Sequence, residues 1–182
     1  MYDLVAIGDA TLDVFIQIDD ATVECELDNQ NCKLCFNYAD KIAAKRVDFV
    51  IGGNAINAAV GARRLGLSSA FLATIGDDDT GQKITDVLRK EGVSEEYVTI
   101  EQGQPSNYSV VINFHGERTI LVHHVPRQYT WNIQEPPKWF YLTSMGEGFE
   151  PIYDKVIEVM RQGNIFLAYN PGTHQLKKGL EF

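Results

Sequence analysis

The sequence lacks any long hydrophobic run. Its longest apolar stretches, such as Ile165 to Ala168, are much shorter than the roughly 20 residues that a membrane-spanning helix needs. The first residues, Met1 to Gly8, also lack the basic segment, apolar stretch and cleavage site of a secretory signal. We therefore expect no membrane partner and a cytoplasmic location.

Basic residues are few. Lys and Arg number 16 against 25 Asp and Glu, and the net charge is -9 at pH 7. Affinity for nucleic acid comes from clustered Lys and Arg that contact phosphates, so we expect no nucleic-acid partner. Hydrophobic residues make up 45% and charged residues 23% of the 182 positions, which is ordinary for a folded globular protein of one domain.

Cysteine is scarce as well, with only Cys25, Cys32 and Cys35. An odd number of cysteines without an export signal favours reduced thiols over a disulfide framework. The spacing Cys32-x-x-Cys35 is that of half a zinc site, and Cys25 would supply a third ligand, but a closed structural site needs four. A loop with unmodified thiols and a zinc-stabilised interaction module therefore both stay open.

Short apolar runs recur along the chain, and glycine directly follows two of them, at Gly8 and Gly76. The runs occupy residues 4–7, 71–75, 140–142 and 165–169, and each is typical of a buried strand. Helical stretches are expected from about residue 55 to 65, from the carboxylates of residues 77–79 to Gly92, and over residues 152–161. This strand–helix–strand order predicts an α/β fold whose sheet is mostly parallel, with crossover helices.

Two segments depart from this order. Residues 19–48 are polar and irregular, and a connection of this length is typical of a functional loop, such as a lid or an insertion. Residues 108–114 and 118–124 alternate polar and apolar side chains about His115-Gly116-Glu117, which predicts an antiparallel hairpin.

A glycine pair opens the first long helix, where Gly52-Gly53-Asn54 is followed by Asn57. Glycine allows the backbone to approach a ligand closely, and the first turn of a helix presents free N–H donors. The turn is therefore suited to bind hydroxyl groups or an anion. The alternative is that the glycines serve the turn geometry alone.

Five elements in register resemble those of the ribokinase-like (PfkB-family) carbohydrate kinases. They are Gly8-Asp9-x-x-x-Asp13, Gly52-Gly53-Asn54-Ala55-x-Asn57-Ala58, Ile75-Gly76-x-Asp78-x-x-Gly81, Gly116-Glu117-Arg118-Thr119 and Asn170-Pro171-Gly172. They cover essentially the whole chain, in the order and spacing of the family.

The resemblance implies a three-layer α/β/α fold with a small β lid. Residues 1–182 would form a single incomplete ribokinase-like domain with lid elements near 14–50 and 106–125, and the C-terminal part of the fold would be missing. It also implies that Asp13, Gly52, Gly53 and Asn57 bind the substrate. A carboxylate and amides suit this role because each sugar hydroxyl both donates and accepts a hydrogen bond.

Four further residues are candidates for substrate binding, and each has a structural alternative. Asn54 is equally suited to cap the helix, and Arg118 to lie on an exposed hairpin edge. Asn107 precedes a lid strand, where family members place a polar residue over the substrate. Asn170 ends a strand at the carboxyl edge of the sheet, where ligands of open α/β folds bind, or it serves the turn before Pro171.

In the resembling family the phosphates and the metal are held by an Asn-x-x-Glu element and an Asp-Thr-x-Gly-Ala-Gly-Asp run, whose final Asp is the catalytic base, and we expect both elements to be absent from this sequence. The complete protein would then transfer the γ-phosphate of ATP, with Mg²⁺, to a hydroxyl of a sugar or nucleoside. This chain alone would be inactive, with its catalytic base beyond residue 182. The alternative is a non-catalytic sugar- or nucleoside-binding protein. Dimers through the lid are common on this scaffold, and the oligomeric state stays open here, as does the identity of the sugar.

Overall fold

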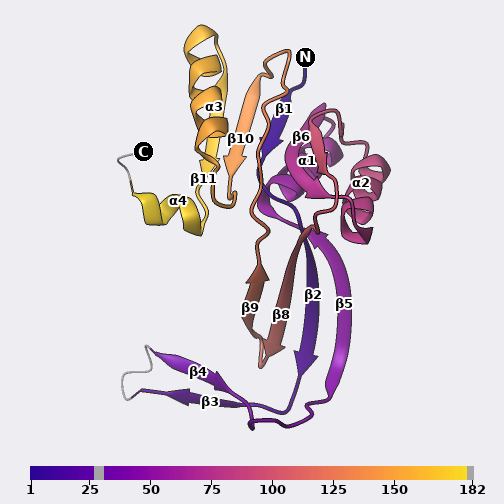
Figure 1. The fold of residues 1–182 in the computed structure, drawn as a ribbon, viewed down its shortest axis with the longest axis vertical. Coiled ribbons are helices and arrows are strands. Elements are labelled where there is room, and N and C mark those ends of the chain that lie inside the picture. The colour runs from indigo at the N-terminus through magenta and orange to yellow at the C-terminus, as the bar shows by residue number, and fades with distance from the viewer. Residues whose placement is uncertain (27–30, 180–182) are drawn as a thin grey trace. The chain divides into compact units, whose positions relative to one another are not determined.

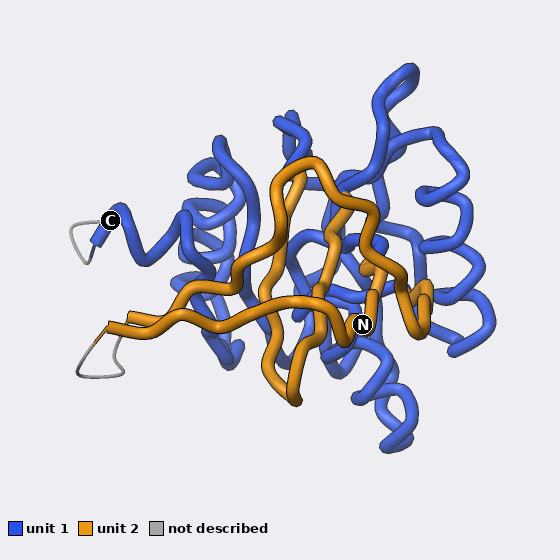
Figure 2. Tube along the Cα trace, turned by 90° about the horizontal axis from the view of Figure 1, so that it is seen from below, with its two compact units in different colours: residues 1–12, 51–107, 124–182 blue, residues 13–50, 108–123 orange. Residues whose placement is uncertain are grey.

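The computed structural model describes residues 1–26 and 31–179, and the chain divides into two compact units (Figures 1 and 2). Unit 1 comprises Met1–Leu12, Ile51–Asn107 and His124–Phe182, and unit 2 comprises Asp13–Val50 and Tyr108–His123. Unit 2 therefore combines the segment expected to be irregular with the predicted hairpin.

Unit 1 contains a five-stranded sheet in the order β11-β10-β1-β6-β7. All four strand pairs in it are parallel, as the strand–helix–strand order predicts. The strands are β1 (Leu4–Ile7), β6 (Ser69–Gly76), β7 (Val98–Glu101), β10 (Trp139–Thr143) and β11 (Phe166–Asn170).

Side chains on alternate residues of the central strands enter two different hydrophobic cores. In β1, Val5 and Ile7 lie in a core with residues of helix α3 (Glu150–Gln162), such as Ile152. Ala6 lies in the other core, with residues of helix α1 (Asn54–Arg64) such as Ile56. Both faces of the sheet are thus covered, as parallel sheets require, and unit 1 has the expected three-layer α/β/α architecture.

The second helix, α2 (Asp79–Glu91), shows the expected caps. The Asp78 carboxylate accepts a hydrogen bond from the Gly81 N–H at 2.9 Å, and Gly92 ends the helix with a positive φ of 71°. The carboxylates before α2 therefore serve the helix start.

A short helix, α4 (Thr173–Lys178), follows β11. In the parts of the chain that the structure describes, no helix is long and apolar enough to cross a membrane.

Unit 2 is built on a four-stranded sheet in the order β5-β2-β8-β9. Its strands are β2 (Thr11–Ile18), β5 (Ala44–Gly52), β8 (Asn107–Phe114) and β9 (Glu117–His123). β8 and β9 pair antiparallel and are joined by the two residues His115 and Gly116, which both have positive φ. This backbone geometry matches the right-handed twist of the strands, and it confirms the predicted hairpin.

The interpretation of residues 19–48 as irregular is wrong for much of the segment. β3 (Thr22–Cys25) and β4 (Cys32–Cys35) form a two-stranded antiparallel sheet, and β5 already begins at Ala44. Most residues of β5 and all residues of β3 are exposed. Because most of these side chains are exposed, no buried apolar face marks the strands in the sequence.

Gly53 holds the start of α1 against the turn that follows β1. Its φ of 117° is outside the range that other residues adopt readily. A Cβ atom at this position would lie 2.5 Å from the carbonyl oxygen of Asp9 and 3.2 Å from the Cα of Ala10. Gly53 is therefore required by its backbone conformation and by close contact, whatever it also does for a ligand.

We expect Gly53→Ala to destabilise unit 1 by about 2 kcal/mol or more, because a non-glycine residue at positive φ is strained and the new methyl group meets backbone. Urea unfolding measures the change. A Cβ atom added to Gly61 in α1 would meet nothing within 4 Å, so Gly61→Ala is the matched control and should stabilise by roughly 0.5–1 kcal/mol. Equal effects of the two substitutions would contradict the close contact at Gly53.

Candidate functional site

The carboxyl ends of β1 and β10 meet the start of α1 at one edge of the unit 1 sheet. Gly8 follows β1, and a Cβ atom on it would lie 2.9 Å from both the Cβ of Ala55 and the Cγ2 of Thr143. Gly172, after β11, approaches Ser144 even more closely, because a Cβ atom on Gly172 would lie 2.3 Å from the Cβ of Ser144. Four chain segments therefore converge at this edge, which is where ligands of parallel α/β sheets bind.

Asn54 and Asn170, two of the predicted binding residues, are linked there through Thr143. The Thr143 hydroxyl donates to the carbonyl oxygen of Asn170 at 2.7 Å, and the Asn54 side-chain amide donates to the Thr143 oxygen at 3.4 Å. The Asn170 amide donates to the Tyr141 hydroxyl at 3.2 Å. The structure thus brings the start of α1 and the end of β11 together through polar side chains.

Asp9 is the buried carboxylate of this edge. It accepts hydrogen bonds from the Tyr129 hydroxyl, at 2.9 and 3.1 Å, and from the Gly146 N–H at 2.9 Å. The Gly146 N–H also contacts the Tyr129 oxygen at 2.8 Å, and the Asp9 N–H donates to the Ser144 carbonyl at 3.0 Å. Asp9 therefore ties the turn after β1 to the loop after β10 and to the segment that carries Tyr129.

Burial raises the pKa of Asp9 to about 6, although the hydrogen bonds from Tyr129 and Gly146 and the charges of Arg127 and His174 oppose the shift. Burial and the Asp9 charge raise the pKa of Tyr129, so its hydroxyl stays protonated and remains a donor. The Arg127 side chain is fully buried and is paired with Glu101 at 2.9 Å.

Asp9 and Tyr129 are absent from the residues that we predicted to form the site. The sequence position of Asp9 could have identified it as a site residue, because it directly follows the glycine after a buried strand. No local pattern identifies Tyr129, because it lies in a segment without regular structure and bonds Asp9 from 120 positions away in the sequence.

Asp13 lies in β2, in unit 2. It is half-buried, and burial raises the pKa of its carboxyl group, opposed by a hydrogen bond with Ser109 of β8. A carboxylate has about four acceptor positions, so a hydrogen bond with Ser109 leaves positions for a ligand. This chemistry suits a polyol ligand.

Arg118 lies on the same sheet face as Asp13 but farther along the strands. Ser109, which bonds Asp13, pairs with Val122 of β9, and Arg118 pairs with Asn113. Four residues along β8 separate the two levels, or about 13 Å. This register places Arg118 near the hairpin end of the face and away from the level of Asp13. Its side chain is exposed there.

Asn57 is exposed on α1 and lines a hollow with Val60, Arg64 and Glu91. Arg64 and Glu91 are joined by two hydrogen bonds of 2.8 and 2.6 Å. Gly52, Gly53 and Asn57 belong to unit 1 and Asp13 to unit 2. The convergence of these residues on one ligand therefore stays a prediction.

Asn107 has a structural partner. It is buried, and its side-chain oxygen accepts a hydrogen bond from the Val125 N–H at 2.9 Å. This bond links the start of β8 to the segment that follows β9. Its acceptor is therefore engaged within unit 1, and contact with a substrate stays a prediction.

The expected absence of an Asn-x-x-Glu spacing is wrong, because Asn132-Ile133-Gln134-Glu135 has it. The Glu135 carboxylate pairs with the amino group of Met1 at 3.1 Å. Met1 precedes β1, so Glu135 lies at the amino edge of the parallel sheet, opposite to the edge that carries Asp9. The spacing is present, but its position is not that of a phosphate or metal site beside the substrate.

The expectation of three reduced thiols is wrong, because Cys25 and Cys32 form a disulfide and only Cys35 is free. The three-cysteine zinc site is also contradicted. Disulfide sulfur is not the thiolate that zinc requires, and Cys35, three residues after Cys32 in β4, projects from the opposite face of the strand. In the described part of the chain, no group of three or more His, Cys, Asp or Glu residues is arranged to hold a metal ion.

The Asp9 carboxyl group should make stability depend on pH. Its pKa is about 6 in the folded state against 3.8 for the ordinary group, so its contribution is greatest at low pH and is lost as the pH rises through 6, by up to roughly 3 kcal/mol. Asp9→Asn removes this titration. We expect the difference in unfolding free energy between wild type and Asp9→Asn to change between pH 4 and pH 7.

Urea unfolding at several pH values measures that difference. Asp154→Asn, at an exposed position of α3, is the control and should follow the wild-type profile. Tyr129→Phe removes a bond that lowers the Asp9 pKa, so it should move the titration to higher pH. A wild-type minus Asp9→Asn difference that is constant over this range would contradict a raised pKa.

Comparison with known proteins identifies the family of this chain. The model of the pfkB family carbohydrate kinase matches residues 15–141. A probable fructokinase-3 of Arabidopsis thaliana is 28% identical over 136 residues, which cover 68% of this chain and 39% of the relative. A fructosamine kinase FrlD of Bacillus subtilis is 34% identical over 73 residues, which cover 40% of this chain and 26% of the relative.

Solved structures show the same fold. A ribokinase of Arabidopsis thaliana, in complex with ribose and ATP, superposes on this chain with a TM-score of 0.71 at 19% sequence identity. The superposition covers 92% of this chain and 53% of the ribokinase chain. A fructokinase of Halothermothrix orenii superposes with a TM-score of 0.66 at 18% identity, over 92% of this chain and 56% of its own. This chain thus spans about half the length of these kinases or less. On the family match and the ribokinase-like fold together, the chain belongs to the pfkB family of carbohydrate kinases.

Proposed function

We propose that this chain supplies the sugar-binding part of an ATP-dependent carbohydrate kinase. The complete protein transfers the γ-phosphate of ATP to a hydroxyl group of its substrate, and this chain provides the substrate pocket and the lid. The observation that carries the proposal is the convergence of Gly8, Gly53 and Thr143 at the carboxyl edge of the sheet, in a chain that the pfkB family model matches.

The start of α1 is suited to bind hydroxyl groups. Gly53 is its N-cap residue, and no side chain that the structure describes caps the helix there. The N–H groups of the first helical turn have no partner within a helix, so they are donors at the edge where the segments converge. Asn54 adds a side-chain amide to this edge.

Asp13 supplies the strongest acceptor in this proposal. Its carboxylate is half-buried and holds one partner, Ser109. A hydrogen bond to a charged group contributes about 1.5–3 kcal/mol. Together, an acceptor on β2 and donors at α1 match the two hydrogen-bonding modes of a sugar hydroxyl.

The substrate class is a sugar, with nucleosides as a related option. The matched relatives are named as fructokinases and a fructosamine kinase, and the structural neighbours include a ribokinase and a nucleoside kinase. Arg118, at the far end of the Asp13 face, is placed for a larger or phosphorylated substrate more than for the hydroxyls next to Asp13.

ATP and Mg²⁺ belong to the remainder of the complete protein. The sequence contains no Gly-Ala-Gly-Asp run, and its Asn-x-x-Glu spacing lies at the amino edge beside Met1. The residues of this chain therefore do not fit the nucleotide, and we derive no phosphoryl-transfer step for it. By itself the chain should bind substrate without phosphorylating it.

A thermal-shift series on the whole chain with D-fructose, D-ribose and adenosine tests the binding function. A ligand at 100 times its Kd adds about 2.7 kcal/mol to stability, so at least one of these compounds should raise the melting temperature by several degrees. Asp13→Asn should weaken that binding about tenfold or more. Asp154→Asn, at an exposed position of α3, should bind like wild type.

Three results would contradict the proposal: no shift with any of the compounds, equal binding by Asp13→Asn and Asp154→Asn, or a phosphorylated sugar formed by this chain with ATP and Mg²⁺. The rival function is a non-catalytic sugar- or nucleoside-binding protein without a kinase half. The coding sequence after residue 182 separates the two. A continuation that encodes a Gly-Ala-Gly-Asp run indicates the kinase, and a stop codon with a stable, sugar-binding product indicates the binder.

A further inference from the structure

The β3–β4 hairpin carries all three cysteines and belongs to neither of the larger sheets. Cys25 and Cys32 are directly opposite each other in the antiparallel register and are joined by a disulfide. The Glu26 N–H donates to the Asn31 carbonyl at 3.1 Å just beyond them. The disulfide therefore closes the hairpin at the outer end of its paired residues.

The hairpin has two chemically different faces. Side chains alternate along each strand, so the disulfide shares its face with the neighbouring pair Val23 and Leu34. The pair Thr22 and Cys35 lies on the other face. Cys32 and Cys35 thus project to opposite sides, although the Cys-x-x-Cys spacing suggests a redox pair.

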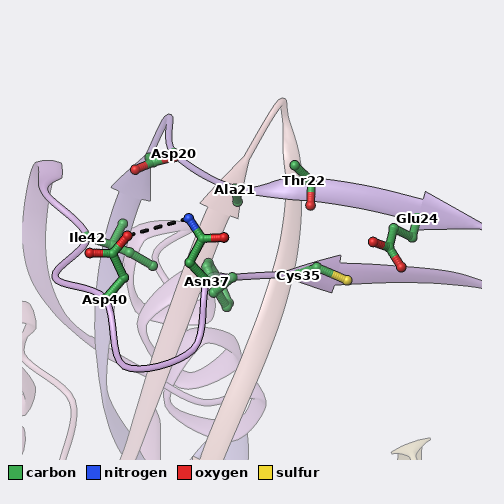
Figure 3. Close-up of a pocket in the computed structure, with 9 residues that line it drawn as sticks. Asp20, Ala21, Thr22, Glu24, Cys35, Asn37, Asp40 and Ile42 are labelled. Carbon is green, nitrogen blue, oxygen red and sulfur yellow. Dashed lines mark hydrogen bonds between the residues drawn. The ribbon is translucent and has the colours of Figure 1, made fainter.

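A polar hollow occupies the second face (Figure 3). Asp20, Glu24, Asp40 and Cys35 line it, and the Asn37 amide donates to the Asp40 carboxylate at 3.5 Å. Reactive cysteines lie in electropositive surroundings, and an incoming thiolate is repelled by nearby carboxylates. Lys33 shares the face of Cys35 and is directly opposite Glu24, so three carboxylates stand against one ammonium group there. The net negative charge around Cys35 disfavours its participation in thiol exchange.

The disulfide is accessible to reagents in solution, because both Cys25 and Cys32 are exposed. Exposed disulfides are the ones that exchange readily with thiols. The two strands have four residues each, and an isolated two-stranded hairpin is only marginally stable in water. Reduction of this bond should therefore loosen the hairpin itself.

We propose that Cys25 and Cys32 are a reversible thiol–disulfide exchange site, with small or protein dithiols as its co-reactant, and that Cys35 does not take part. One thiolate of the dithiol attacks a sulfur of the Cys25–Cys32 bond and forms a mixed disulfide, and the other cysteine leaves as a thiolate. The second thiolate of the reagent then displaces the first cysteine. The hairpin gains two electrons and two protons, and the dithiol becomes a cyclic disulfide.

Thiol alkylation of the whole chain tests the proposal. The chain is equilibrated in mixtures of reduced and oxidised dithiothreitol, quenched with a maleimide and analysed by peptide mass spectrometry. We expect one maleimide on Cys35 in every mixture. Labels on Cys25 and Cys32 should appear together in a single two-electron step, and Cys35→Ser should leave that step unchanged.

Trypsin cleavage after Lys33 reports the state of the hairpin. Because the cross-link restricts the open hairpin and two paired strands alone are marginal, cleavage should be about tenfold faster or more after reduction. The Cys25→Ser/Cys32→Ser double variant should be cleaved at this fast rate with or without dithiothreitol. The Cys35→Ser variant should retain the wild-type response.

Several outcomes would overturn the proposal. They are a Cys32–Cys35 bond in the oxidised chain, three labelled thiols in every mixture, a disulfide that native protein keeps in excess dithiothreitol, and cleavage after Lys33 at one rate in both states. None of these readouts involves a sugar. The exchange site is therefore tested independently of the proposed kinase function.

Discussion

The turn after β1 is held from two sides, and the arrangement of the carboxyl edge depends on it. On one side, the carbonyl oxygen of Asp9 approaches Gly53 so closely that no Cβ atom fits at that position. On the other side, the Asp9 carboxylate accepts hydrogen bonds from Tyr129 and from the Gly146 N–H. The first contact positions the start of α1, and the second positions the loop after β10. A site built from helix N–H groups needs this backbone to be placed within a few tenths of an ångström.

The fold of unit 1 was predictable because its local signals agree with one another. Glycine follows or ends β1 and β6, helix α2 carries both of its caps, and side chains of β1 alternate between two cores. The β8–β9 hairpin was predictable for a similar reason, since its turn chemistry fits the register. β3 and the first residues of β5 bury neither face, so hydrophobic periodicity, on which such predictions rest, is absent from them.

The candidate site was predictable only where a residue's role follows from its neighbours in sequence. Gly53 and Asn54 are placed by the start of a helix, and Asn170 by the end of a strand. The Asp9–Tyr129 bond joins positions 120 residues apart, and no local pattern specifies such a partner. Local sequence likewise did not predict the state of the cysteines. Their count and spacing favoured reduced thiols or zinc, whereas the strand register decides that Cys25 faces Cys32 and that Cys35 lies on the other face.

Chain connectivity links the exchange site to the residues proposed to bind sugar. The β3–β4 hairpin lies between Ile18, which ends the strand that carries Asp13, and Ala44, which begins the strand that leads into Gly53. β2 and β5 have eight and nine residues and belong to a four-stranded sheet, whereas β3 and β4 have four residues each and pair only with each other. Free energies of local opening follow the number of such contacts. The hairpin is therefore able to open while the strands on either side of it remain paired. This separation is what allows a thiol reagent to act on the hairpin without unfolding the sheet that holds Asp13.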